Sequence, residues 1–271
     1  EFVSQYELHE GKEKYDGKLQ DLYKNNFEKF ISYNIKDVEL ILKLDTILKL
    51  TEYFDNIRRF AKCLFSDVYH NSKVVDILLL CYCKDKFVLP STIRRETKTY
   101  EGAYVVKPET GLFENVAVFD FKSLYPSIMY SFNISYETIN KDGFKIDKYS
   151  FSKELGIIPI LIKDILDIRT ELKRKMKNCS YDSQEYRIYD TQQTVAKFLI
   201  NSIYWVVGFS QFRLYKIECA EATTFIARTL IKKAISIAET NNFKVIAGDT
   251  DSCFIALDNK CINDAKELMT K

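Results

Sequence analysis

The sequence contains no C-x-x-C pair, and its seven cysteines are irregularly spaced along 271 residues. This spacing excludes a zinc ribbon and gives no sign of a disulfide framework, so we expect a reducing, intracellular compartment. Long apolar runs are also missing. The longest, residues 77–83, is too short to span a bilayer, and no signal peptide precedes it, so we expect no membrane partner.

The sequence also lacks a strong net charge, an internal repeat and a low-complexity segment. Its formal net charge is only +2, so any nucleic-acid surface must be local. The length allows one large domain or two modest ones with an ample core. The chain starts at Glu1 without a methionine and stops at Lys271 inside a charged, helix-like stretch. We therefore expect it to be a fragment of a longer protein.

The apolar pattern predicts an α+β fold in which helices are inserted between strands that carry acids. Helical periods run through residues 37–50 and 56–83, and short extended pieces between turn residues follow over 90–111. Residues 116–119 are predicted to form a buried strand, and residues 244–257 a β-hairpin. Longer helices are predicted over 160–178, 190–204 and 218–240, the first two as a helical hairpin, with a short helix after Pro126.

Three acids occupy strand-like segments far apart in the sequence. Asp120 follows four apolar residues, and Asp249 and Asp251 lie at the turn of the predicted hairpin. Such acids suit a site for two divalent cations, because Mg²⁺ prefers oxygen ligands. The alternative is ordinary turn chemistry, since Asp favours turns. The presence of further segments with matching chemistry favours the metal interpretation.

Cationic and amide side chains follow one face of each helix of the predicted hairpin. Lys197 and Asn201 are four residues apart, and Arg169 and Lys173 repeat the spacing on the preceding helix. A solvated helix face is the ordinary explanation for such charges. Two facing helices with the same spacing instead favour a clamp for an anion such as a triphosphate.

Tyr125, five residues after Asp120, is a rigid aromatic that could form the floor under a nucleotide sugar. From the chemistry alone, a core tyrosine is the better interpretation, because the chain holds eighteen tyrosines.

Three segments together resemble the polymerase motifs of the family B DNA-dependent DNA polymerases. They are DFKSLYPSI at 120–128, KFLINSIYW at 197–205 and GDTDS at 248–252. Tyr33 and Asp37 also resemble the third exonuclease motif, and YEGA at 100–103 resembles the link between exonuclease and polymerase regions. Among these enzymes, the sequence most resembles the polymerases of large eukaryotic DNA viruses and the delta-like replicative polymerases.

The resemblance implies a polymerase palm whose antiparallel sheet carries the acids, with inserted helical-hairpin fingers. The helical tail of an RNase H-like exonuclease domain would precede them. The implied boundaries are exonuclease tail and linker helices 1–90, first palm part 91–159, fingers 160–210 and second palm part 211–271. The first two exonuclease motifs are expected before Glu1, and the thumb is expected to be absent from these residues.

The resemblance also implies a role for individual residues. Asp120 and Asp251 would be the main ligands of two Mg²⁺ ions, with Asp249 a lesser one and the Phe121 carbonyl completing one coordination sphere. Tyr125 would discriminate the sugar, and Tyr204 would touch the nascent base pair from the minor-groove side. The remaining nucleotide-binding residues would be Ser123, Leu124, Arg169, Lys173, Lys197 and Asn201. Lys122 receives no role.

The implied function is template-directed DNA synthesis from dNTPs on a primer–template, with a processivity factor as a further partner. The site of action would be the nucleus or a viral replication site. Two alternatives stay open: a catalytically inactive nucleic-acid-binding remnant and a two-metal nuclease. The sequence departs from the family pattern where Trp205 replaces glycine and Ala247 replaces tyrosine. The indole puts the close packing of that helix on the nascent pair in doubt.

Overall fold

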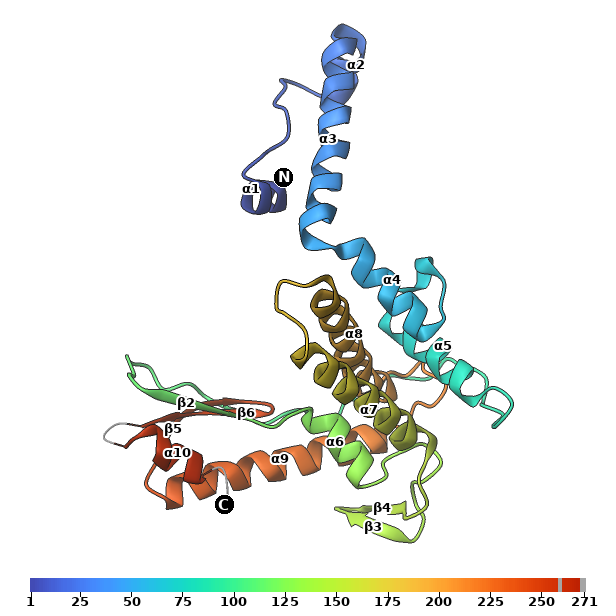
Figure 1. Ribbon diagram of the computed structural model, residues 1–271. Helices are drawn as coiled ribbons and strands as arrows, with labels where there is room; N and C mark the ends of the chain where they lie inside the picture. The colour runs from blue at the N-terminus through green and yellow to red at the C-terminus, as the bar shows by residue number, and fades with distance from the viewer. Residues whose placement is uncertain (258–259, 269–271) are drawn as a thin grey trace. The chain divides into compact units, whose positions relative to one another are not determined.

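The computed structural model describes residues 1–257 and 260–268 and divides into two compact units, Glu1–Arg59 and Phe60–Lys271. We describe each unit by itself (Figure 1). The first contains α1 (Phe2–Leu8), α2 (Leu19–Asn25) and α3 (Phe27–Leu48). Helix α4 (Leu50–Ala61) begins in the first unit and ends in the second.

Helix α3 is longer than the predicted helix over 37–50. Its start is fixed by Asn26, whose side chain accepts a hydrogen bond from the backbone N–H of Lys29. Its apolar residues Val38 and Ile41 are exposed, and Leu40 is buried. The periodicity therefore predicted the helix correctly, whereas burial of that face depends on packing that this unit does not supply.

The predicted helix over 56–83 is broken in the structure. Helix α4 ends at Ala61, Lys62 has a positive φ of 57°, and the short 3₁₀ helix η1 (Phe65–Asp67) follows. Helix α5 (Asn71–Cys83) then packs against α8 of the second unit. Leu79 is buried whereas Leu80 is exposed, because consecutive helical residues point in different directions.

A four-stranded antiparallel sheet forms the centre of the second unit, in the order β1 (Val105–Val106), β5 (Lys244–Asp249), β6 (Ser252–Ala256) and β2 (Val116–Asp120). Helix α9 (Ile217–Thr240) runs beneath it (Figure 1). Cys253 and Ile255 lie in the core between the sheet and the helix, with Phe119 packed against them.

The expectation of a fully buried β2 is wrong. Val118 is 55% exposed and Val116 is also exposed, whereas Ala117 and Phe119 face the core. Successive residues of a strand point to opposite faces, and only one face of this sheet is covered by α9. The second face is therefore open, and it is the face that carries Asp120.

Helix α6 (Leu124–Ser131) follows β2 after a tight turn in which Ser123 adopts a left-handed φ of 53°. It starts two residues before Pro126 rather than after it. Proline is tolerated there because the first-turn N–H groups have no partner within the helix. A small hairpin of β3 (Gly143–Ile146) and β4 (Tyr149–Ser152) comes next.

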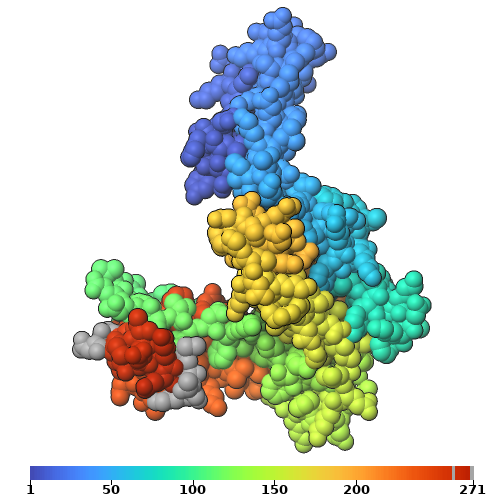
Figure 2. All heavy atoms as spheres, viewed as in Figure 1, coloured from blue at the N-terminus to red at the C-terminus, as the bar shows by residue number. Residues whose placement is uncertain are grey.

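The helical hairpin consists of α7 (Ile157–Lys177) and α8 (Gln184–Val207), both longer than predicted. The two helices pack along their length and contact α6, and their atoms project from the rest of the second unit (Figure 2). Helix α10 (Ile262–Leu268) completes the elements. Within residues 1–257 and 260–268, no helix has the length and apolar character that a membrane span requires.

Candidate active site

The three predicted acids meet at one end of the sheet. Asp120 on β2 and Asp249 on β5 both pair with Ser252 of the intervening strand β6. Paired residues of neighbouring strands share a face, so both acids lie on the open face, with Ser252 between them. Two inter-strand spacings separate their backbones by roughly 10 Å.

Asp251 reaches the site from the two-residue turn that joins β5 to β6. The backbone N–H of Phe121 donates to the Asp251 carbonyl over 2.8 Å, which fixes the turn against the end of β2. Thr250 has a positive φ of 57°, and its N–H donates to the Tyr104 carbonyl over 3.1 Å. The Thr250 hydroxyl donates to the Asp249 carboxylate over 2.9 Å.

The charges at this end of the sheet repel one another. Burial raises the pKa of Asp251 above its usual value, and the next cause is repulsion from Asp120, which exceeds that from Asp249. Lys197 acts in the opposite direction. Asp120 and Asp251 are therefore the more closely coupled pair, and a cation between them would relieve both effects.

Among the residues that the structure describes, no three Asp, Glu, His or Cys side chains are close enough together to hold a metal ion. Ser252 lies between Asp120 and Asp249, so Asp249 stands apart from the other two acids. The ligand roles of Asp120, Asp249 and Asp251 stay predictions. A pair of carboxylates still fits Mg²⁺, because this ion is usually held by one or two protein carboxylates together with substrate phosphates.

One pocket of about 330 Å³ collects residues from all three motifs. Two acids, Asp120 and Asp251, line the pocket. Two cations, Arg169 and Lys197, line it from the two helices of the hairpin. The other predicted residues that line it are Ser123, Leu124, Tyr125, Asn201 and Tyr204. Segments up to 131 residues apart, from Asp120 to Asp251, therefore meet around one space that offers both negative and positive groups.

The cations that line the pocket form a cluster with Lys173, which lies outside the lining. Arg169 is buried on α7, where its Nε donates to the Gln193 side chain over 3.3 Å, and burial lowers its pKa. The pKa of Lys173 is also lowered, first by burial and then by repulsion from Arg169, Lys122 and Lys197. Lys177 adds a further repulsion, and no carboxylate is among the causes of this shift. A cluster of cations of this kind favours a bound anion.

Lys122 is a pocket residue that the sequence analysis left without a role. It stands in the turn between β2 and α6, two residues after Asp120. The only local signal was a positive charge close to the acid in the chain, and single lysines in turns are too common to be specific.

Two tyrosines form an aromatic floor. The rings of Tyr125 and Tyr204 lie 4.2 Å apart between centroids, tilted by 34°. The Tyr204 hydroxyl lies 3.3 Å from that of Tyr100, so the YEGA segment reaches the site. Burial raises the pKa of Tyr204 well above its usual value, and the hydrogen bond with Tyr100 adds to this.

The YEGA segment is held in place by helix α9. Arg228 donates to the carbonyl oxygens of Glu101 and Gly102, each over 2.8 Å, and the Thr224 hydroxyl donates to that of Glu101 over 2.9 Å. The sequence analysis missed both side chains. Their i, i+4 spacing on one helix was the available signal, but nothing local identifies the segment that they bind.

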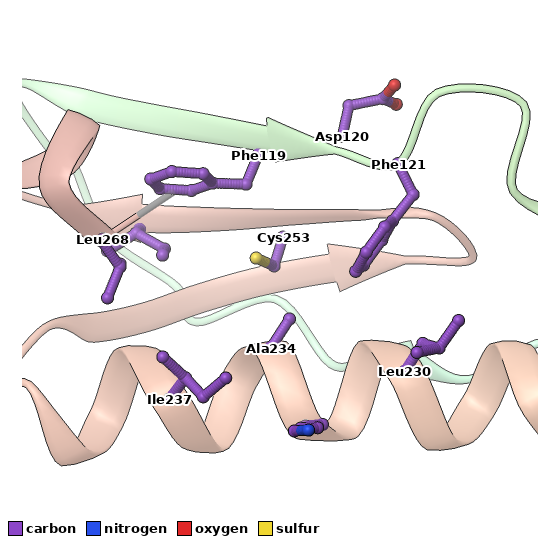
Figure 3. A pocket seen from close by; sticks show the side chains of 10 residues that line it. Phe119, Asp120, Phe121, Leu230, Ala234, Ile237, Cys253 and Leu268 are labelled. Atoms are coloured by element: carbon purple, nitrogen blue, oxygen red, sulfur yellow. The ribbon is translucent and has the colours of Figure 1, made fainter. Parts of the chain in front are cut away.

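Three predicted residues lie outside the pocket lining: Phe121, Lys173 and Asp249. The Phe121 ring points from the sheet towards α9, on the side opposite the Asp120 carboxylate (Figure 3). There it lines an apolar pocket of about 390 Å³ with Phe119 and Leu230. The predicted role of Phe121 concerned its backbone carbonyl, so the ring position leaves that prediction open.

Tyr33 and Asp37, the predicted exonuclease residues, belong to the first unit. The Lys12 ammonium donates to the Asp37 carboxylate over 2.9 Å and to the Tyr33 hydroxyl over 3.4 Å. Within the described part of the chain, Asp37 belongs to no group of three or more acid, His or Cys side chains that could hold a metal ion. Its carboxylate forms an ion pair with Lys12.

A model of the DNA polymerase family B matches residues 62–271, which is most of the chain and nearly the whole second unit. The chain belongs to DNA polymerase family B. The motif resemblance is confirmed at the level of the family.

Archaeal members of family B are among the relatives of this chain. It is 40% identical over 207 residues to a DNA polymerase of Archaeoglobus fulgidus, covering 73% of this chain and 26% of that protein. It is 33% identical over 263 residues to DNA polymerase 1 of Sulfolobus acidocaldarius, covering 85% and 30% respectively. The expected likeness to viral enzymes stays a prediction.

The fold is similar to that of a solved family B polymerase from Pyrobaculum calidifontis. The TM-score is 0.77 at 26% identity, covering 99% of this chain and 37% of that one. The mixed helix-and-sheet class is thereby confirmed. The chain spans about a quarter to a third of the length of the relatives that it matches.

Proposed function

We propose that this family B chain carries the nucleotidyl-transfer site of a DNA-directed DNA polymerase, with a primer–template and dNTPs as substrates. The observation that carries the proposal is the single pocket in which Asp120 and Asp251 face Arg169 and Lys197. Acids suit metal ions, and cations suit a polyphosphate. A site that joins the two chemistries suits transfer of a nucleotidyl group to a primer 3′-hydroxyl.

Asp120 and Asp251 would hold two Mg²⁺ ions, with the Phe121 carbonyl as a further ligand and Asp249 as a weaker one. When bound, the ions supply Lewis-acid activation of the primer hydroxyl and charge neutralisation at the phosphates. The hydrogen bond from Phe121 to the Asp251 carbonyl keeps the two carboxylates at the same end of the sheet. The chain itself thus contributes fixed positions and negative charge.

Arg169, Lys173 and Lys197 would bind the triphosphate, with Asn201 supporting that contact. They are carried by two packed helices, which fix the backbone positions from which these side chains reach the anion. Lys122 would join them, because it belongs to the same cation cluster. As charge develops on the leaving pyrophosphate, these groups stabilise it in a partly desolvated pocket.

Tyr125 would discriminate between sugars, and Tyr204 would contact the nascent base pair. Each ring is supported by the other at 4.2 Å. A supported ring cannot turn away from an added 2′-hydroxyl without losing that stacking contact, and this is the physical basis for selection. Ser123 and Leu124, which line the same pocket, would complete the sugar side.

We further propose that the β-sheet with α9 is the palm and that α7 and α8 are the fingers. Residues 1–90 would be the tail of an exonuclease domain and its linker helices, with Tyr33 and Asp37 as exonuclease residues. The thumb and the other exonuclease motifs would belong to the rest of a longer protein. That protein would act inside a cell, in the nucleus or at a viral replication site, with a processivity factor as a further partner.

A nuclease or an inactive remnant has less support. A two-metal nuclease needs no triphosphate clamp, yet three cations, Lys122, Arg169 and Lys197, line the same pocket as Asp120 and Asp251. A remnant has no need to keep Asp120, Asp251 and Lys197 around one pocket. The two departures from the motifs, Trp205 for glycine and Ala247 for tyrosine, remove no charge. Both positions also keep their secondary structure, since Ala247 pairs with Phe254 in the sheet and Trp205 lies within helix α8.

Primer extension by the full-length protein tests the proposal. We expect Mg²⁺-dependent extension that is abolished by Asp120→Asn, and no comparable degradation of DNA when dNTPs are absent. Degradation at the same rate without dNTPs would support the nuclease instead. The isolated 271 residues should extend primers poorly and should not proofread, because few phosphate contacts remain. Degradation that Asp37→Ala abolishes would contradict the assigned exonuclease boundary.

A further inference from the structure

Trp205 is the one tryptophan of the sequence, and 69% of its side-chain surface is exposed. Its neighbours on α8 behave differently: Tyr204 is only 4% exposed, and Val206 and Val207 are buried. Tryptophan is on average among the more deeply buried residues, because its ring carries a large apolar surface. The folding of α8 does not use this surface, so another role is expected.

The indole lies at one end of the candidate active site. Lys197, Asn201 and Trp205 follow one another at four-residue intervals along α8, and all three line the same pocket. The helical rise places Trp205 roughly 12 Å along the axis from Lys197. The pocket thus offers a cation at one end of this stripe and an open aromatic surface at the other.

The indole makes an edge-to-face contact with the ring of Tyr204, with centroids 5.6 Å apart and planes inclined by 62°. Because 69% of the surface of Trp205 is exposed, much of its ring stays accessible. A flat apolar group is the natural partner of such a face, and every nucleobase has one.

We propose that Trp205 is a stacking platform for an unpaired base of the single-stranded template at the edge of the polymerase site. The strand identity rests on the proposed function. A base within the nascent duplex has both faces covered by neighbouring pairs, whereas the first unpaired base has a free face. In the proposed function the incoming nucleotide is bound by the Tyr125–Tyr204 pair and the cation cluster. The exposed indole is then available to the template strand.

Because Trp205 is the single tryptophan, its emission reports directly on this contact. The 271-residue chain is titrated with an oligothymidylate in EDTA without any nucleotide, and we expect quenching of the emission at saturation. Unchanged emission at saturation would overturn the proposal. Quenching by dTTP with Mg²⁺ but not by the oligonucleotide would overturn the assignment to the template strand.

Variants supply the second measurement, with affinity followed by the anisotropy of a labelled oligonucleotide. Trp205→Ala should weaken binding about 5- to 150-fold, the range for loss of one base–aromatic stack. Trp205→Phe should stay within about threefold of the unmodified chain. Tyr181→Ala, which removes an exposed aromatic outside the pocket, should have no effect. Equal affinity of Trp205→Ala and the unmodified chain, with both folded by circular dichroism, would refute the stacking role.

The salt dependence separates stacking from phosphate binding. Trp205→Ala should leave the slope of log affinity against log salt unchanged, because an indole releases no counterion. A smaller slope would mean that the variant disturbed phosphate contacts, and this would count against the proposal. Failure of the full-length protein to extend primers would refute the proposed function alone, since the titration needs neither nucleotide nor metal.

Discussion

The backbone N–H of Phe121 donates to the carbonyl of Asp251 over 2.8 Å, and this bond joins two segments 130 residues apart. One segment is the end of β2, where Asp120 stands, and the other is the turn between β5 and β6. The acids at their tips are thereby kept within range of mutual repulsion, and burial together with this repulsion raises the pKa of Asp251. The sheet holds them there at a cost in free energy that a bound cation would offset.

Metal binding should stabilise the chain through Asp251. Addition of Mg²⁺ is expected to raise the melting temperature by about 2 °C, because a cation that binds only the folded state shifts the unfolding equilibrium. Asp251→Asn should remove this rise, and Asp249→Asn should retain most of it. Thermal unfolding with and without EDTA measures the effect. A full rise in Asp251→Asn would show that the metal binds elsewhere.

Tyr125→Ala in the full-length protein should increase ribonucleotide use relative to deoxyribonucleotide use by about 10- to 100-fold, since a steric contact worth a few kcal/mol is lost. Tyr125→Phe keeps the ring and its stacking on Tyr204, so it should leave the ratio unchanged. The measurement is single-nucleotide kcat/KM for both sugars. An unaltered ratio in Tyr125→Ala would remove Tyr125 from sugar discrimination.

Lys173→Ala should weaken dNTP binding by about tenfold or more, the loss expected for one charge-assisted contact. It should not lower the melting temperature, because the pKa of Lys173 is depressed by burial and by neighbouring cations. Arg174→Ala is the matched control, since Arg174 is exposed and paired with Glu171 at 2.8 Å. Calorimetric titration with a dNTP distinguishes the two variants. Equal affinities would refute the clamp.

The ion pair of Arg213 and Asp76 should be the electrostatic contact that matters most for stability in the second unit. Its two hydrogen bonds, of 2.5 and 2.8 Å, tie the segment after α8 to helix α5, and both side chains are largely buried. Either single alanine variant should lose about 2–3 kcal/mol of unfolding free energy, because an unpaired buried charge remains.

The Arg213→Ala, Asp76→Ala double variant should lose less than the sum of the single variants. Urea unfolding of the four proteins in the cycle gives the coupling energy. Additive losses would mean that the two charges act independently despite their contact.

The sequence by itself determined the elements and the chemistry of the motifs. The apolar periodicity predicted helices at the positions of α3, α7, α8 and α9. The acids at the strand ends could be identified from the sequence as well, because both properties are local. The identities of Asp120, Asp251, Lys197 and Tyr125 were therefore available before any coordinates, and the span that matches family B, residues 62–271, contains all four.

The tertiary structure alone decided which of these residues meet. The pairing of β2 with β6 placed Ser252 between Asp120 and Asp249, so the three acids became a pair and an outlier. Strand register depends on contacts far apart in the chain, and no local pattern encodes it. The open face of β2, the inclusion of Lys122 and the exposure of Trp205 follow from packing in the same way, since each depends on what the neighbouring elements leave uncovered.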